Sequence, residues 1–308
     1  MNVTRNVDTY NEAFTKNFIS LTFGCIIISI NGAFVYTYYK SEVFQRDPRY
    51  IMYIHLVIND MVMLALSVML QIMSYTITLS FPSCTLIVMV LLTTTKVSPL
   101  NLAGMAVDRY IAVCYPLRHT QICTVRRTYA LIAVIWVISF LPVFTDLILL
   151  LSQPLPLITS NFICYSSYVF STPIHKLHKK ITQALLFSSV LLTLMVTYLK
   201  VICIARSASG SQKVLARNAL NTILLHGVQL LLCMFSYMSP VINLILISIK
   251  PQERTKILFV TFLFSNVLPR LLSPFIYGVR DKKFNNHIRM HFCRRCFHPV
   301  EKKVKVTV

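Results

Sequence analysis

The chain has 308 residues, of which 56% are hydrophobic and 13% are charged, and its formal net charge is +20. About a quarter of the residues of a soluble domain are charged, so the composition excludes an ordinary soluble domain, and the hydrophobic content excludes a disordered chain. The apolar residues fall in blocks of about 20 or more, long enough to cross the hydrocarbon core of a bilayer. The sequence therefore predicts a polytopic membrane protein.

Seven apolar blocks are long enough to be membrane-spanning helices. They cover residues 18–39, 50–73, 84–107, 128–151, 181–205, 219–249 and 257–279. We expect an all-α bundle of seven helices over residues 18–279, preceded by a terminus of residues 1–17. Residues 280–308 are expected to form a basic tail with a short amphipathic helix. Residues 1–17 lack the apolar stretch of a cleavable signal peptide, so the first span is expected to act as the insertion signal.

The distribution of Lys and Arg predicts the orientation of the chain. Residues 40–50, 108–127, 200–217 and 280–308 hold 20 of these residues, whereas residues 1–17, 74–83, 152–180 and 250–256 hold 8. Cytoplasmic connections carry the excess, so the N-terminus is expected outside the cell and the C-terminus in the cytoplasm. Asn2 begins an Asn-Val-Thr glycosylation acceptor and agrees with this orientation. Basic charge beside a membrane favours anionic lipids as partners and not nucleic acid.

Short motifs follow one another along the spans. They are Asn31 in the first span, Asn59-Asp60 in the second, Asp108-Arg109-Tyr110 at the end of the third, the only Trp, Trp136, in the fourth, and Ser273-Pro274-Phe275-Ile276-Tyr277 at the end of the last. Cys84 lies 25 residues before Arg109. In a helix this spacing corresponds to about 38 Å, so the two residues are expected at opposite membrane faces.

This ordered set resembles the rhodopsin-like (class A) G-protein-coupled receptors. Three stretches, at residues 47–50, 98–104 and 224–229, are most similar to fish odorant receptors. The resemblance covers residues 18–292. It implies a multi-pass receptor of the plasma membrane that needs no cofactor, binds a small-molecule odorant in the outer half of the bundle, and activates a heterotrimeric G protein of the olfactory or stimulatory type.

The resemblance also assigns residues to activation. The coupling residues that it implies are Asp108, Arg109, Tyr110, Tyr198, Pro274 and Tyr277. None of the ten acidic residues lies in the sixth span, so the resting partner of Arg109 is expected to be the adjacent Asp108. On activation Arg109 is expected to help form the cavity for a Gα helix, with Tyr198 and Tyr277 as hydroxyl partners. The alternative is a juxtamembrane Arg held at the lipid interface.

The chain departs from the family pattern at three positions. Val190 replaces a common Pro in the fifth span, and Ser273 replaces Asn in the last. In the sixth span, Tyr237 precedes Met238-Ser239-Pro240 where the family has Cys-Trp-x-Pro. The class is unchanged by these departures, whereas the details of activation are open.

The nine cysteines divide by compartment. Cys84 and Cys164 are the two on the predicted outer side, and we expect them to form a disulfide. Cys293 and Cys296 form a Cys-Arg-Arg-Cys pair in the tail, where palmitoylation and no modification are the two interpretations. No metal site is expected, because zinc in the tail would need two more ligands, and a His175/His178 pair in a basic loop is expected to be solvated.

Four polar residues are predicted in the bundle core, namely Asn31, Asp60, Ser98 and Arg270. Asp60 and Arg270 lie at similar depths, which allows an ion pair, and an unpaired charge there would be costly. The family binds sodium at the position of Asp60, and Arg270 would replace that ion. The alternative is that Arg270 faces the outer, water-filled cavity.

Candidate ligand-binding residues lie in the third and sixth spans. They are Leu91, Leu92, Thr95, Lys96, Met238, Val241 and Ile242. Amine receptors carry an Asp where this chain has Leu91, so a cationic amine is a poor ligand. Lys96 would attract an anionic group or pair with Asp146, and both interpretations remain open.

Other functional classes fit less well. A retinal protein needs a Schiff-base Lys midway along the last span, and the nearest, Lys256, lies at its outer end. A channel or transporter would show inverted repeats or several embedded carboxylates. A non-olfactory class A receptor remains the nearest alternative, and no catalytic constellation indicates an enzyme.

Overall fold

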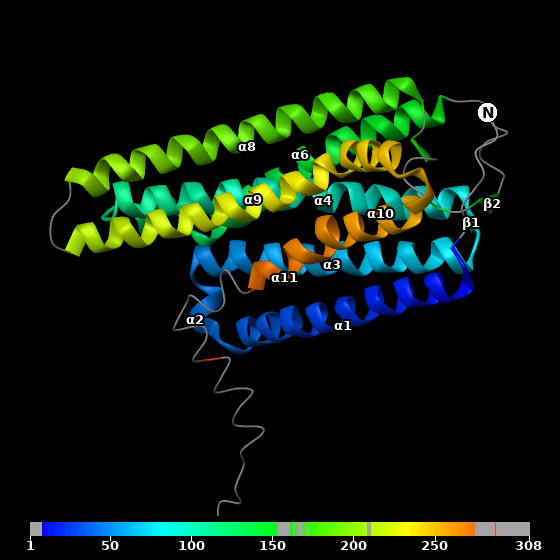
Figure 1. Cartoon of the computed structure of the whole chain (residues 1–308). Helices are drawn as coiled ribbons and strands as arrows, with labels where there is room; N and C mark the ends of the chain where they lie inside the picture. The colour runs from blue at the N-terminus through cyan, green and yellow to red at the C-terminus, as the bar shows by residue number, and fades with distance from the viewer. Residues whose placement is uncertain are drawn as a thin grey trace, which may run out of the picture.

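The computed structural model describes residues 8–152, 161–162, 164, 169–170, 172–207, 211–274 and 287. Its long helices run side by side as one bundle, with α1 and α8 on opposite flanks (Figure 1). The long helices are α1 (Tyr10–Lys40), α3 (Pro48–Thr76), α4 (Phe81–Cys114), α6 (Val125–Leu151), α8 (Pro173–Ser207) and α9 (Ser211–Ile249). The last span is a run of η2 (Pro251–Glu253), α10 (Arg254–Phe262), η3 (Leu263–Val267) and α11 (Leu268–Pro274). Two short helices, α2 (Glu42–Gln45) and α5 (His119–Ile122), lie in the connections.

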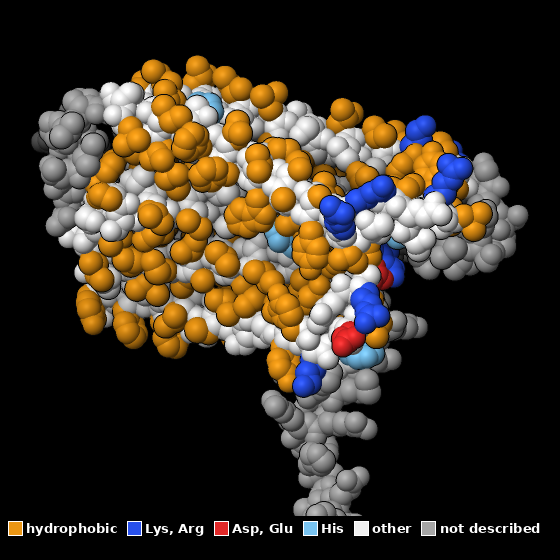
Figure 2. All heavy atoms as spheres, turned by 180° about the vertical axis from the view of Figure 1, so that it is seen from behind, with side chains coloured by type: hydrophobic (Ala, Val, Ile, Leu, Met, Phe, Trp, Pro, Cys, Tyr) orange, Lys and Arg blue, Asp and Glu red, His pale blue; other side chains and the backbone are white. Residues whose placement is uncertain are grey.

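The helical bundle predicted from the sequence is confirmed. Six helical segments of the described chain are long and apolar enough to cross a membrane, and α9 occupies the sixth expected span. Large apolar side chains cover much of the side of the bundle, whereas Lys and Arg gather at one end (Figure 2). An apolar surface of this extent is costly in water and favourable in lipid.

Capping residues determine where several helices begin. Glu12 accepts a hydrogen bond from the backbone N–H of Thr9, which precedes α1. Asp47 accepts from the backbone N–H of Arg49 at 3.0 Å, and Pro48 occupies the first turn of α3. Thr124 accepts from the N–H of Arg127 at the start of α6. Such caps satisfy N–H groups that have no partner inside the helix.

Polar side chains join α3 to its neighbours inside the apolar bundle. The Asn101 amide donates to the backbone carbonyl of Met52 at 2.9 Å, and Trp136 Nε1 donates to His55 Nε2 at 2.9 Å. Gly104 permits close contact here, because a Cβ at that position would lie 2.7 Å from Met52 Cε. These contacts set the register of α3, α4 and α6, and α4 carries Asp108-Arg109-Tyr110 and four of the candidate ligand residues.

The disulfide Cys84–Cys164 closes one end of the bundle, with 5.6 Å between the two Cα atoms, and the predicted pairing is present. Beside it, β1 (Leu79–Ser80) pairs antiparallel with β2 (Asn161–Phe162). The all-α expectation therefore omitted a sheet of two short strands, which forms where the disulfide holds the long connection against the start of α4. We call this end of the bundle the disulfide end, and the opposite one the Arg109 end.

The fifth long helix starts earlier than expected. The sequence placed its beginning at residue 181, but α8 begins at Pro173. Thr172 accepts a hydrogen bond from the backbone N–H of His175, as an N-cap does, and Pro173 fits the first turn. Three lysines in the first turns interrupt the apolar pattern without interrupting the helix.

Candidate functional site

Asp108, Arg109 and Tyr110 lie in the last turns of α4, at the Arg109 end. The carboxylate of Asp108 accepts a hydrogen bond from His119 Nε2 on α5, with 3.0 Å between the two atoms. This contact holds the short helix α5 against the end of α4. The structure therefore gives Asp108 a partner that the sequence analysis did not name, and the expected contact between Asp108 and Arg109 stays a prediction.

Asp47 and Arg49 lie near this motif at the start of α3. Arg49 Nη2 donates to Asp47 Oδ2 at 2.6 Å, and Nε of the same guanidinium donates to both carboxylate oxygens. Burial of Asp47 raises its pKa, but the hydrogen bonds and charge of Arg49, with the charge of Arg109, lower the pKa by more. The net effect is a lowered pKa, and Asp47 stays ionised at neutral pH.

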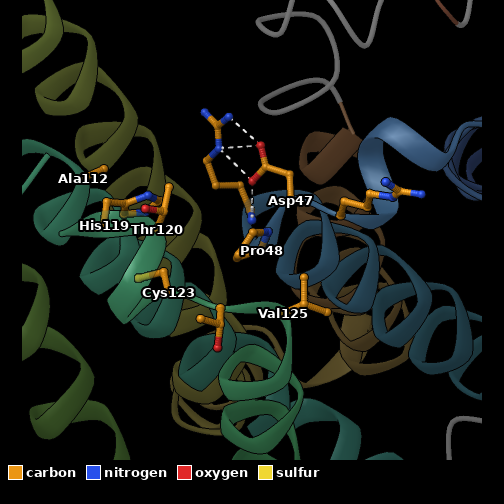
Figure 3. A pocket seen from close by; sticks show the side chains of 10 residues that line it. Asp47, Pro48, Ala112, His119, Thr120, Cys123 and Val125 are labelled. Carbon is orange, nitrogen blue, oxygen red and sulfur yellow. Dashed lines mark hydrogen bonds and ion pairs between the residues drawn. The ribbon is translucent and has the colours of Figure 1, made fainter. Parts of the chain in front are cut away.

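A cavity of about 620 Å³ opens between the start of α3, α5 and the start of α6. Figure 3 shows Asp47 and Pro48 on one side of it and His119, Thr120 and Cys123 on the other. Its polar rim includes Arg46 and Arg49. The cavity therefore lies beside the residues that the family resemblance assigns to G-protein coupling.

Tyr110 and Tyr198 belong to one small apolar cluster at the Arg109 end. Both pack against the fully buried Val201 of α8, together with Val113 and Leu220. Tyr198 is thus held at the Arg109 end, between α4, α8 and α9, where a hydroxyl partner of Arg109 is expected. Tyr277 and the side chain of Pro274 lie outside the described residues.

The predicted polar core is buried and hydrogen-bonded across α3 and α4. Ser98 donates to Asp60 Oδ1 at 3.0 Å, and the Asn59 amide donates to Ser98 Oγ at 3.0 Å and to the carbonyl of Thr94 at 2.9 Å. Asn31 is fully buried on α1. These residues occupy the depth of the bundle that the sequence predicted for them.

Arg270 is 2% exposed, and its guanidinium contacts two groups in the described part of the chain. Its Nη1 donates to the carbonyl of Ser265 at 2.9 Å, and its Nη2 lies 2.6 Å from Met63 Sδ. Ser265 belongs to the π-helical turn η3, in which backbone hydrogen bonds span five residues instead of four. Arg270 therefore contacts its own span and α3, and its pairing with Asp60 stays a prediction.

The candidate ligand residues are spread over α4 and α9. Leu91, Leu92 and Thr95 are partly buried on α4, and Thr95 Oγ1 lies 3.8 Å from Met63 Sδ. On α9, Met238 and Val241 are 47% and 49% exposed, whereas Ile242 is partly buried. Their contact with a ligand stays a prediction.

A charged cluster near the disulfide end was missed by the sequence analysis. Asp146 Oδ1 accepts a hydrogen bond from His178 Nδ1 at 2.7 Å, and the carbonyl of Asp146 accepts from His175 Nε2 at 3.1 Å. His175 is 2% exposed, so the expectation of two solvated loop histidines is wrong. The spacing of three residues places both on one helical face, which is the signal that the sequence offered.

Lys96 is 8% exposed and lies on α4 near this cluster. The charge of Asp146 acts on it, but no ion pair within 4.0 Å joins the two side chains, because the carboxylate is bonded to His178. An anionic ligand group and a longer-range interaction with Asp146 therefore remain the two interpretations of Lys96. Asn2, Cys293 and Cys296 lie outside the described residues.

Comparison with known proteins identifies the family. The family model for the 7 transmembrane receptor (rhodopsin family) matches residues 30–277. The chain is 30% identical over 271 residues to Odorant receptor 131-2 of Danio rerio, which covers 87% of this chain and 83% of that protein. It is 27% identical over 298 residues to Olfactory receptor 2A12 of Homo sapiens, with 92% of each chain covered. The match spans every helix from α3 to α10 and both cysteines of the disulfide, and the chain belongs to the rhodopsin family of seven-transmembrane receptors.

Proposed function

We propose that this receptor detects a small-molecule odorant and activates a heterotrimeric G protein, of the olfactory or stimulatory type. The two relatives named above are an odorant and an olfactory receptor and match most of this chain. The observation that carries the proposal is the position of Asp108-Arg109-Tyr110 at one end of α4, with Cys84 and its disulfide at the other. The two ends of one helix thereby hold a coupling motif and the mouth of a ligand site.

The orientation belongs to the same proposal. The Arg109 end faces the cytoplasm and the disulfide end faces outward, with the N-terminus outside. The excess of Lys and Arg in the connections at the Arg109 end supports this, as does their clustering on the described surface (Figure 2). Anionic lipids of the cytoplasmic leaflet are the partners that this basic end favours.

Ligand binding is placed in the half of the bundle that faces outward. Leu91, Leu92, Thr95 and Lys96 of α4 and Met238, Val241 and Ile242 of α9 are the candidate contacts. Because Lys96 supplies a buried cation and Leu91 supplies no anion, the ligand is neutral or carries an acidic group. A cationic amine would meet the charge of Lys96 without a partner.

The test of coupling is Arg109→Ala in cells expressing the receptor, read as cyclic AMP after a panel of neutral and acidic odorants. We expect normal surface expression and ligand binding with at least a tenfold loss of response, because Arg109 lies at the end of α4 remote from the ligand half. Arg126→Ala, an exposed Arg at the same end, is the matched control and should respond as the wild type does.

Each of three results would contradict the proposal in whole or in part. An unchanged response of Arg109→Ala at equal surface level would show that the motif does not couple. A ligand-evoked ionic current without any second messenger would favour a channel, the alternative function for seven helices. A response only to non-odorant ligands would keep the receptor class and remove the odorant use.

A further inference from the structure

Three side chains with metal-binding atoms converge at the Arg109 end. They are Asp108 of α4, His119 of α5 and Cys123, the residue after α5. One ligand atom from each lies within 4.8 Å of the other two, and no other such group of three occurs in the described part of the chain. All three side chains are partly buried, so they are accessible to an ion without being loose surface groups.

The contacts among these atoms are already close to those of a metal site. His119 Nε2 lies 3.0 Å from Asp108 Oδ1, and Cys123 Sγ lies within 4.8 Å of a ligand atom of each. Tetrahedral zinc with its usual bond lengths separates two N, O or S ligands by about 3.3–3.6 Å. An ion bound among these three side chains would therefore require them to move by only about 1 Å.

The chemistry of the donor set selects a class of ion. One thiol, one imidazole and one carboxylate suit Zn²⁺ and similar divalent transition metals, whereas Mg²⁺ and Ca²⁺ require several oxygen ligands. His119 and Cys123 both line the 620 Å³ cavity, and Figure 3 shows their side chains beside it. The cavity supplies an entry path and room for a water molecule as the fourth ligand.

We propose that Asp108, His119 and Cys123 form a binding site for Zn²⁺ or a similar divalent transition-metal ion. Two ligands come from α5 and the residue after it, and one comes from α4, so a bound ion fastens the connection between the third and fourth spans to the end of the third span. The carboxylate that it uses is adjacent to Arg109. The site stands on these three side chains and does not depend on which ligand the receptor detects.

The thiol is protonated before metal binds. Burial first, and then the charge and hydrogen bond of Asp108, raise the pKa of Cys123 to about 11. Metal binding must displace that proton, because the thiolate is the ligand.

The direct test is a Co²⁺ titration of the purified full-length receptor, with thiolate-to-cobalt absorption in the near ultraviolet as the readout. The titration uses a chain with Cys293→Ser and Cys296→Ser, which removes the thiols of the tail. We expect one Co²⁺ per receptor, displacement by Zn²⁺, and no displacement by excess Mg²⁺. Absence of the absorption in this chain would overturn the proposal.

Variants of the ligands and matched cysteines locate the site. Cys123→Ser should abolish the absorption, and His119→Asn should weaken Co²⁺ binding at least tenfold. Cys114→Ser, on the last turn of α4, and Cys203→Ser, an exposed thiol of α8, should bind as the parent does. Absorption that survives in Cys123→Ser, or that disappears in Cys203→Ser, would place the metal elsewhere and refute the site.

A measurement on the unmodified chain tests the site without relying on the folding of any variant. Zn²⁺ should slow alkylation of Cys123 at least tenfold, read by peptide mass spectrometry, and leave the alkylation of Cys203 unchanged. Equal rates at Cys123 with and without Zn²⁺ would contradict the proposal. None of these readouts involves receptor signalling, so a failure of the proposed odorant function would leave the metal site untouched, and the reverse also holds.

Discussion

Partners of buried charges in this receptor are set by geometry more than by charge alone. Asp146 had Lys96 as the obvious counter-ion, yet its carboxylate is bonded to His178. Arg270 had Asp60, yet it donates to a carbonyl five residues earlier in its own span. A buried polar side chain bonds to a group that it can reach with good geometry. A buried donor or acceptor left without a hydrogen bond would cost more free energy than a missing opposite charge.

Replacement of His178 tests the Asp146–His178 contact. His178→Ala leaves a buried carboxylate oxygen without its donor, so the free energy of unfolding should fall by about 1–3 kcal/mol. The measurement is the midpoint of thermal unfolding in detergent. His178→Asn, whose amide can donate, should recover part of the loss, and Lys176→Ala, an exposed residue of the same helix, should have no effect. An unchanged midpoint for His178→Ala would mean that the contact contributes nothing.

At the residue scale, the sequence predicted positions better than contacts. The burial of Asp60, Ser98 and Asn31 followed from their depth in apolar spans, and the structure agrees. The partner of Asp108 did not follow, because His119 lies 11 residues along the chain on a connection whose fold the apolar pattern does not specify. The Cys84–Cys164 pair could be predicted because few thiols share that side of the membrane.

Helix boundaries depend on local capping chemistry. The start of α3 is stabilised twice by Asp47, which caps the backbone and pairs with the Arg49 guanidinium. At the exposed α2, by contrast, Glu42 and Arg46 form an ion pair in which both side chains are 82% exposed. Exposed pairs contribute little, so only the first of these ion pairs is expected to affect stability.

The contribution of Asp47 to the stability of the folded chain should depend on pH. Its pKa is lower in the folded chain than the unfolded value of about 3.9, so it stabilises the fold above that value and the effect is lost as the pH falls through the folded pKa. Asp47→Asn keeps a good cap and should lower the thermal midpoint at about pH 6, by an amount that shrinks at low pH, below about 3.9. Asp47→Ala should cost about 1 kcal/mol more, because the cap is also lost.

Glu42→Gln is the control for this experiment, and it should leave the midpoint unchanged at both pH values. A deficit of Asp47→Asn that persisted at low pH would show that the carboxylate charge is not its cause.

At the scale of elements, the sequence located each span but not every end. The start of α8 was placed too late because Lys176, Lys179 and Lys180 break the apolar pattern, whereas the cap at Thr172 and the Pro at 173 mark the true boundary. The periodicity of apolar residues in the sequence gives no sign of the π-helical turn η3, because this turn depends on how it packs against α9 and α3. A pattern of apolar residues indicates which positions are buried. It does not indicate which backbone groups hydrogen-bond to one another, and the structure is needed for that.

The whole molecule is polarised along its helices. One end holds the disulfide, the two-stranded sheet and the Asp146 cluster, and the other holds Asp108-Arg109-Tyr110, the cavity and the basic surface. Asp8 adds to the closure of the disulfide end, because its carboxylate accepts from Lys16 on α1 and from Tyr75 on α3 at 2.6 Å each. Burial raises the pKa of Asp8, and these hydrogen bonds together lower it by more.

The proposed orientation can be tested at Asn2. If the N-terminus is outside, the acceptor Asn2-Val3-Thr4 enters the lumen during synthesis and receives a glycan. Treatment with an endoglycosidase should then increase the mobility of the wild-type chain on a gel. Asn2→Gln should already show the higher mobility, and Asn6→Gln, an Asn outside any acceptor sequence, should behave as the wild type. A chain without glycan whose N-terminal tag is reached only after permeabilisation would reverse the orientation.

The π-helical turn in the last span changes the direction in which every later side chain of that span points. One extra residue in a helix rotates the following side chains by about 100° and advances them by about 1.5 Å. Arg270, three residues past the end of η3, is buried, and a continuous α-helix would turn the same position by about 100°. A relative without the turn would therefore align with this chain up to residue 262 and then fall one residue out of phase. Sequence comparisons that ignore the insertion would assign the wrong face of the helix to each later position, so gaps in this span carry structural information.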